Sequence, residues 1–178
     1  DKNKIDTMIA FTKPQYHASL TYSMQRGGWD SSEYFTTNDI HEMGSTAKAD
    51  AYALRGYWRP EESGTSTPEI SVGFDLITFD NHALNIDEGS GYFVGLGWQD
   101  MFQADDRIGL AIGQPVKATA ATAGNSLTEV DPFMWEAYYS FKANDSVTVT
   151  PAIWGGTDVS ANNTQDVFGT MLTTTFKF

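Results

Sequence analysis

The side chains that could carry catalytic chemistry are few and scattered along this chain. His17, His41 and His82 lie far apart and show neither the HxxH nor the HExxH spacing that places two imidazoles on one metal ion. The chain contains no Cys, which excludes thiolate ligands and disulfide bonds. No GxSxG, Walker or GxGxxG motif occurs in the sequence either. We therefore expect no enzymatic activity, and neither a metal ion nor a cofactor.

Two carboxylates could form the acid and base of a glycosidase. Asp75 and Glu136 would then have to lie about 5 to 10 Å apart. Both occupy polar positions within segments of alternating polarity, which is more typical of separate residues that line a polar interior. Gly95 and Gly97 alternate in the same way, and we interpret them as relieving crowding on an inward face.

These side chains would be positioned by β-strands. Nine segments alternate apolar and polar residues with a period of two, which is the pattern of a strand with two different faces. The predicted strands span residues 4–12, 15–26, 48–59, 69–79, 91–102, 107–116, 132–142 and 146–156, followed by a closing strand that ends at Phe178. We predict an all-β, antiparallel, up-and-down fold that forms a single domain over residues 1–178.

The two faces of the predicted strands differ in kind. One face carries large apolar residues such as Leu54 and Trp58, whereas the other mixes Gly, Ser, Thr, Gln and a few charges, such as Arg55. A lipid-facing belt requires the first kind of face and a water-filled lumen requires the second. Aromatic residues also gather near segment ends, where interfacial girdles lie. The pattern favours a transmembrane β-barrel over a soluble β-sandwich, which alternation alone would also allow.

Charge and hydropathy narrow the choice of partners. The net charge of −12 argues against nucleic acid, because phosphate binding needs clustered Lys and Arg. No run approaches the roughly 18 apolar residues of a transmembrane helix. Barrel strands need only about 10 alternating residues each, so a membrane stays compatible with the sequence. We expect outer-membrane lipid to surround the chain and no nucleic acid to bind it.

The predicted connections alternate in length. Counting back from Phe178, the long ones are 157–165, 117–131, 80–90 and 27–47, and they alternate with 143–145, 103–106, 60–68 and 13–14. Outer-membrane barrels have short periplasmic turns and longer extracellular loops, and residues 60–68 are the one exception on the short side. Nine strands cannot close a bacterial barrel of even strand number, and the chain starts at Asp1 without an initiator Met. We therefore expect the C-terminal part of a larger, processed or truncated barrel, whereas a true count of eight strands would allow a small closed one.

Strand parity selects the residues that would line a lumen. The pore-lining candidates are Asp6, His17, Arg55, Arg59, Asp75, Gln99, Arg107, Glu136, Lys142 and Lys177. Five of these residues are basic and three are acidic, which predicts a modest preference for anions. The preference should be small, because salt at physiological strength screens charges beyond about 8 Å.

The last part of the chain resembles the C-terminal repeat of cyanobacterial outer-membrane porins of the OprB-like, carbohydrate-selective or iron-uptake group. The resemblance rests on the run EAYYSFKANDSVTVTPAIWGGTDV, followed by DVFGTMLTTTFKF. Its specific elements are the aromatic strand with Glu136 and Tyr139, the turn Asn144-Asp145-Ser146, the strand through Pro151, the loop near Asn162 and the terminal Thr174 to Phe178. Together they cover roughly the last 45 residues, and the strand rhythm extends the likeness more loosely to the rest.

The resemblance implies a porin in a bacterial cell outer membrane. Family members have a barrel of about 16 strands and allow passive diffusion of small hydrophilic solutes, including sugars, inorganic ions and iron species. Phe176 and Phe178 would form the insertion signal read by the barrel-assembly machinery, and the protein would form a homo-trimer. Two alternatives remain open at this point: a soluble secreted β-sandwich binding module, and a small outer-membrane barrel without an open pore.

Overall fold

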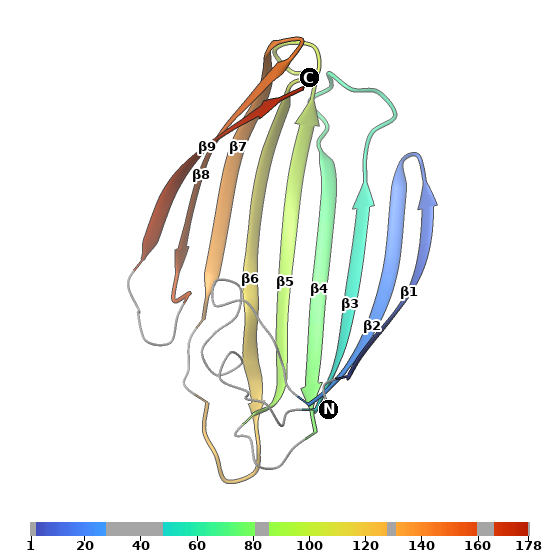
Figure 1. Cartoon of the computed structure of the whole chain (residues 1–178), viewed down its shortest axis with the longest axis vertical. Coiled ribbons are helices and arrows are strands. Elements are labelled where there is room, and N and C mark those ends of the chain that lie inside the picture. Colours follow the sequence, from blue (N-terminus) through green and yellow to red (C-terminus); the bar gives the residue numbers. More distant parts are fainter. Residues whose placement is uncertain (1–2, 28–47, 81–85, 128–130, 160–165, 178) are drawn as a thin grey trace.

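The computed structural model describes residues 3–27, 48–80, 86–127, 131–159 and 166–177. They form nine antiparallel strands in one sheet, ordered as in the chain, which confirms the predicted all-β, up-and-down fold (Figure 1). None of the described residues forms a helix long and apolar enough to cross a membrane. The strands are β1 (Asn3–Lys13), β2 (Tyr16–Arg26), β3 (Lys48–Trp58), β4 (Glu69–Phe79), β5 (Ile86–Gln99), β6 (Arg107–Ala121), β7 (Phe133–Asn144), β8 (Val147–Thr157) and β9 (Val167–Phe176).

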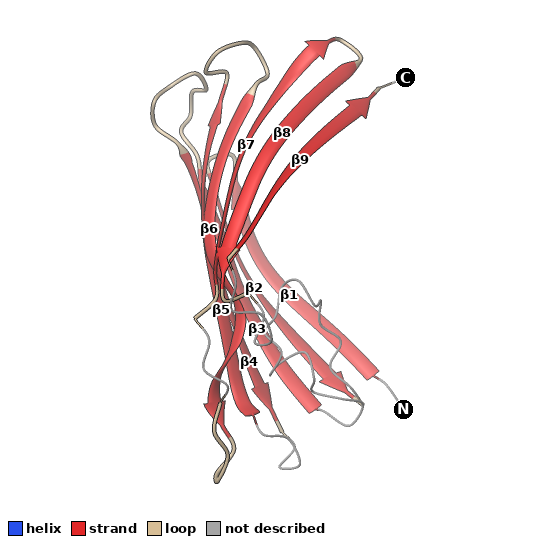
Figure 2. Cartoon of the chain, turned by 90° about the vertical axis from the view of Figure 1, so that its left-hand side faces the viewer, coloured by secondary structure: helices blue, strands red, loops and turns tan. Residues whose placement is uncertain are grey.

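The sheet is open and curved. Each strand pairs with its neighbours in sequence, so β1 and β9 are its two edges. Figure 2 shows both edges to the same side of the central strands, which gives the sheet one convex and one concave face. Connections 14–15, 59–68, 100–106 and 145–146 meet at one end, called the turn end below, and the opposite end is called the loop end (Figure 1).

The pairing register keeps the two kinds of side chain apart. Directly paired residues of neighbouring antiparallel strands project from the same face, so a row of partners can be followed across the sheet. One such row is apolar and the next is small, polar or charged. The first contains Leu20, Leu54, Phe74 and Tyr92, and the second contains Ser19, Arg55 and Gly73 before it reaches an aromatic residue, Phe93, on β5.

Two strands extend further toward the loop end than the sequence predicts. β5 begins at Ile86 instead of residue 91, and β6 continues to Ala121. Their pairing contains register shifts between Ile86 and Glu88, between Glu88 and Gly89, and between Ser90 and Tyr92. Such bulges oppose two residues to one, which interrupts the period of two on which the prediction relied.

The contrast between long and short connections is consequently weaker than predicted. The β4–β5 connection shrinks to residues 80–85 and the β6–β7 connection to 122–132. At the turn end, the β5–β6 connection grows to residues 100–106. Connection length alone is therefore poor evidence for the sidedness of this sheet.

A buried carboxylate organises the β5–β6 turn. Asp106 has no exposed surface, and its carboxylate accepts the backbone N–H groups of Met101 at 2.8 Å, Phe102 at 3.0 Å and Gln103 at 3.1 Å. The hydroxyl of Tyr139 on β7 donates a fourth hydrogen bond, at 3.0 Å. Burial alone would raise the pKa of Asp106, but the four donors together outweigh it and hold the pKa below its usual value.

We expect Asp106→Asn to destabilise the protein clearly more than the matched change Asp105→Asn. An amide group would turn N–H donors toward backbone N–H donors that need an acceptor. Asp105 is 65% exposed and pairs only with Lys142 at the surface, so its charge contributes little. The measurement is urea unfolding of both variants in detergent micelles.

The lowered pKa of Asp106 also makes the stability of the protein depend on pH. The ionised Asp106 contributes its full share to the free energy of unfolding above about pH 3.9, the pKa of an Asp in the unfolded chain. This contribution is lost as the pH falls through the lower pKa that Asp106 has in the folded protein. Acid should therefore destabilise the parent protein below about pH 4 more than it destabilises Asp106→Asn. Identical acid unfolding of the two proteins would contradict this role of Asp106.

Candidate functional site

Crowding identifies which residues lie on the concave face. A Cβ added to Gly73 would lie 2.1 Å from the Phe93 ring, and one added to Gly109 would lie 2.1 Å from the Tyr138 ring. On the opposite face the nearest such approach is 2.9 Å, between a Cβ on Gly155 and the Trp135 ring, so side chains crowd more tightly on the face of Gly73, as expected inside a curved sheet. The row of Gly73 and Phe93 is the small and polar one, so the large apolar rows lie on the convex face.

The convex face is apolar and exposed. Leu54, in the middle of β3, is 53% exposed, and Leu172 on the edge strand β9 is 69% exposed. A soluble monomer rarely exposes a contiguous apolar patch above about 600 Å². Exposed apolar side chains of this face include Ile9, Phe11, Tyr16, Leu20, Tyr52, Trp58, Ile70, Val72, Phe74, Tyr92, Leu110, Ile112, Ile153, Phe168 and Phe176.

A charged cluster bounds this apolar band at the loop end. The guanidinium of Arg26 donates to both carboxylate oxygens of Asp50, at 2.9 and 3.0 Å, and the Tyr22 hydroxyl donates to Asp50 at 2.6 Å. On β3 the band runs from Tyr52 to Trp58, about 20 Å along the strand at 3.3 Å per residue. That height is of the order of the apolar band of outer-membrane barrels, about 25 Å.

Eight of the ten predicted lining residues share the concave face. Within the strands, the register assigns to it Asp6, His17, Arg55, Asp75, Gln99, Arg107, Glu136 and Lys142. Arg59 and Lys177 follow the ends of β3 and β9 at the turn end. Phe176 lies on the convex face and is exposed, whereas Phe178 lies outside the described residues.

One ion pair with an uncounted acid, Lys142 with Asp105, offsets part of the predicted basic excess, whereas the pair of Arg55 with Asp75 joins two residues that the count already includes. Arg55 donates to both carboxylate oxygens of Asp75, at 2.7 and 2.9 Å, and Lys142 pairs with Asp105 at 2.6 Å. Asp105 was not among the predicted lining residues, because it lies in a connection where strand parity has no meaning. The count of five basic against three acidic residues therefore overstates the positive charge of this face.

The concave face is apolar near the loop end, a feature that the alternation of residue types does not predict. Ile77 and Phe79 are only 4% and 7% exposed, although both stand at polar-face positions of β4. They form a cluster with Ala49 and Ile86, and Leu127 of the β6–β7 connection packs against it. The signal was present in the sequence, since β4 ends with apolar residues on both faces.

At the turn end the same face is open. A Cβ added to Gly95 would approach nothing nearer than 3.7 Å, and one added to Gly97 nothing nearer than 3.8 Å. These are ordinary contact distances, so our interpretation that both glycines relieve crowding is wrong. Gly97 lines a cavity of about 250 Å³, together with Glu69 of β4 and Gln99 of β5.

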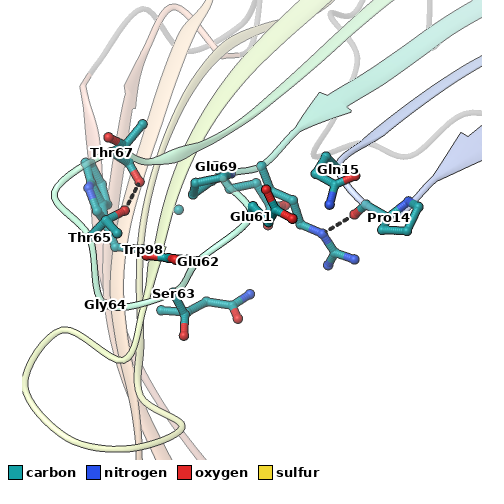
Figure 3. Close-up of a pocket in the computed structure, with 14 residues that line it drawn as sticks. Pro14, Gln15, Glu61, Glu62, Ser63, Gly64, Thr65, Thr67, Glu69 and Trp98 are labelled. Carbon is teal, nitrogen blue, oxygen red and sulfur yellow. Dashed lines mark hydrogen bonds between the residues drawn. The ribbon is translucent and has the colours of Figure 1, made fainter.

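The β3–β4 connection forms the other wall of this cavity (Figure 3). It is held to β5 because Trp98 donates to the Ser66 carbonyl at 3.0 Å and the Gly64 N–H donates to the Gln99 carbonyl at 2.9 Å. Arg59 donates through its Nε to the Pro14 carbonyl at 2.5 Å, which joins the connection to the β1–β2 turn. Glu61 and Glu62 add two carboxylates to that of Glu69.

The two carboxylates considered as an acid and base pair, Asp75 and Glu136, lie on strands β4 and β7, which are not neighbours in the sheet. Asp75 pairs with Arg55 on the neighbouring strand β3. Glu136 pairs with Ala111 of β6, so two whole strands, β5 and β6, separate it from β4 and Asp75. In the described ranges, no group of three His, Asp or Glu side chains is placed to hold a metal ion. His41 and His82 lie outside these ranges.

Comparisons with known proteins find a sequence similarity between this chain and a longer protein. A stretch of 70 residues is 29% identical to "Uncharacterized protein sll0772" of Synechocystis sp. and makes up 39% of this chain. The same stretch is 13% of that protein, so the chain spans only a small part of its length. No family model and no solved structure matches the chain.

The two faces should differ sharply in their tolerance of charge. Leu54→Arg puts a guanidinium in the middle of the convex apolar band and should cost about 2 to 4 kcal/mol of stability in a bilayer. The neighbouring change Ala53→Arg serves as the control, because Ala53 faces inward and is paired with Asp75. We expect Ala53→Arg to cost little in equilibrium refolding with lipid vesicles. Equal losses in both variants would contradict the face assignment.

Proposed function

We propose that this chain forms part of an outer-membrane β-barrel and works as a porin. It would allow passive diffusion of small hydrophilic solutes, such as sugars, inorganic ions and iron species. The observation that carries the proposal is the distribution of exposure over the sheet. Large apolar side chains are exposed on the convex face, while the concave face carries charged, polar and small residues, and its apolar residues Ile77 and Phe79 are buried. Lipid outside and water inside satisfy both faces at once.

A soluble β-sandwich accounts less well for the same face. In a sandwich the apolar sides of two sheets pack against each other. All strands of the described residues belong to one sheet, so the convex residues find no second sheet to cover them. Burial of a side chain such as Leu54 is worth about 1.5 to 3 kcal/mol, and lipid can supply that burial.

The open edges support a barrel with more strands than the nine described. Both β1 and β9 present a full row of backbone groups, and β9 carries neither a charge nor a Pro to block pairing. Soluble proteins protect such edges, and membrane barrels abolish them by closing. We infer that further strands pair with β1 and β9, in a barrel of about 16 strands as the resemblance implies.

The proposed mechanism needs no chemistry. Solutes would diffuse down their gradients, selected by lumen width and by the charges of the concave face. Phe176 and Phe178 would mark the chain for the barrel-assembly machinery, and three copies would form the working trimer. These assignments follow from the resemblance and belong to the proposal.

Channel recording of the complete protein tests the function. We expect stepwise conductance in planar bilayers that rises with salt concentration, and swelling of liposomes in small sugars. A protein that is soluble without detergent and does not conduct would be the sandwich. A protein that inserts but stays silent would be the small closed barrel. Either outcome overturns the porin proposal.

Ion preference should depend on the turn-end cavity more than on the paired residues. Glu61, Glu62 and Glu69 stand there against Arg59. We expect Glu69→Gln to shift the reversal potential toward anions in dilute salt, where screening is weak. The double variant Arg55→Gln, Asp75→Asn removes two opposite charges that already offset each other, and should leave the potential unchanged. The reverse ranking would show that the cavity does not control permeation.

A further inference from the structure

The loop end of the concave face carries a covered apolar layer. Ile77 pairs with Ala51 on one side and Gly89 on the other, and Gly89 pairs with Ala118, so one inward row crosses β3 to β6. Ile77 is nevertheless 4% exposed. If water filled the lumen at this level, the Ile77 side chain would be exposed to it. Water is therefore excluded from this stretch of the wall.

The cover comes in part from the β6–β7 connection. Leu127 packs against the cluster around Ile77 and Phe79. The connection begins with a turn in which the Asn125 N–H donates to the Thr122 carbonyl at 2.9 Å, and Gly124 adopts a φ of 92°. The Thr122 hydroxyl donates to Asp87 at 2.9 Å, which fixes the start of the connection to β5. The chain therefore turns back over the concave face instead of projecting from it.

We propose that residues 122–127 form a fixed constriction on this wall, with Leu127 as its anchor. The inference rests on the proposed porin function and adds to it which residues narrow the lumen. Solutes would be kept off the wall of β3 and β4 at the loop end, whereas the wall around Gly95 and Gly97 of β5, toward the turn end, would be open to them. Ile77, Phe79 and Leu127 would then help to set the size limit without touching any binding site.

The first test measures water access and needs no channel activity. The chain has no Cys, so single cysteines can be introduced at Ile77 and at Thr21, which lies on the same concave face but is half-buried and outside the cluster. A small charged thiol reagent should modify Thr21→Cys at least ten times faster than Ile77→Cys in lipid vesicles. Ser126→Cys, exposed beside Leu127, should also react fast. Equal rates at positions 21 and 77 would overturn the proposal.

The second test measures the lumen. Leu127→Asp places a charge in the apolar cluster and should release the connection, which raises single-channel conductance and the largest sugar that enters liposomes. Leu127→Met keeps an apolar anchor and should leave both unchanged. If Leu127→Asp does not fold, Leu127→Ala provides the same comparison with a smaller effect. Channels of unaltered conductance and size limit in the folded variant would refute the constriction alone, whereas a silent parent protein would refute the porin function.

Discussion

The structure depends on one constraint, which is that all eight strand pairings keep the same two faces in phase. Because side chains alternate along a strand, a slip of one residue in any pairing would carry every following apolar residue to the concave side. Rows such as Leu20, Leu54 and Phe74 stay continuous because the register holds. The shifts in the β5–β6 pairing lie near the loop end and the shift in the β7–β8 pairing, between Lys142 and Asn144, lies at the turn end, so neither disturbs the apolar band.

The alternation of residue types predicted much of this fold. It located nine strands, most of them to within two residues, and it assigned eight of the ten lining candidates to a common face, because both depend only on parity. It failed where parity is interrupted or absent. The bulges of β5 and β6 hid their extra length, and the Asp106 turn and the ion pair of Lys142 with Asp105 involve residues in connections. Leu127 could not be placed because its contacts depend on how a non-repeating segment folds back.

The two ends of the concave face differ in character. At the loop end, Ile77 and Phe79 are covered, and the wall resembles the interior of a small soluble domain. At the turn end, Gly97 and three glutamates surround an open polar cavity. A passage built this way would filter by size where it is dry and by charge where it is wet. Each property could change through its own residues, because the two regions share no side chain.

The strictly sequential strand order also bears on how such a sheet can form and how it could have grown. Every strand pairs only with the strand before or after it in the chain, so no pairing waits for a distant segment. Contacts that are local in sequence close small loops and favour rapid assembly. Each completed hairpin exposes a new edge for the next one. Duplicating or deleting one hairpin would therefore change the width of the sheet while leaving all other pairings intact. A hairpin is thus the smallest segment that can be added or removed without re-pairing the remaining strands in a new order.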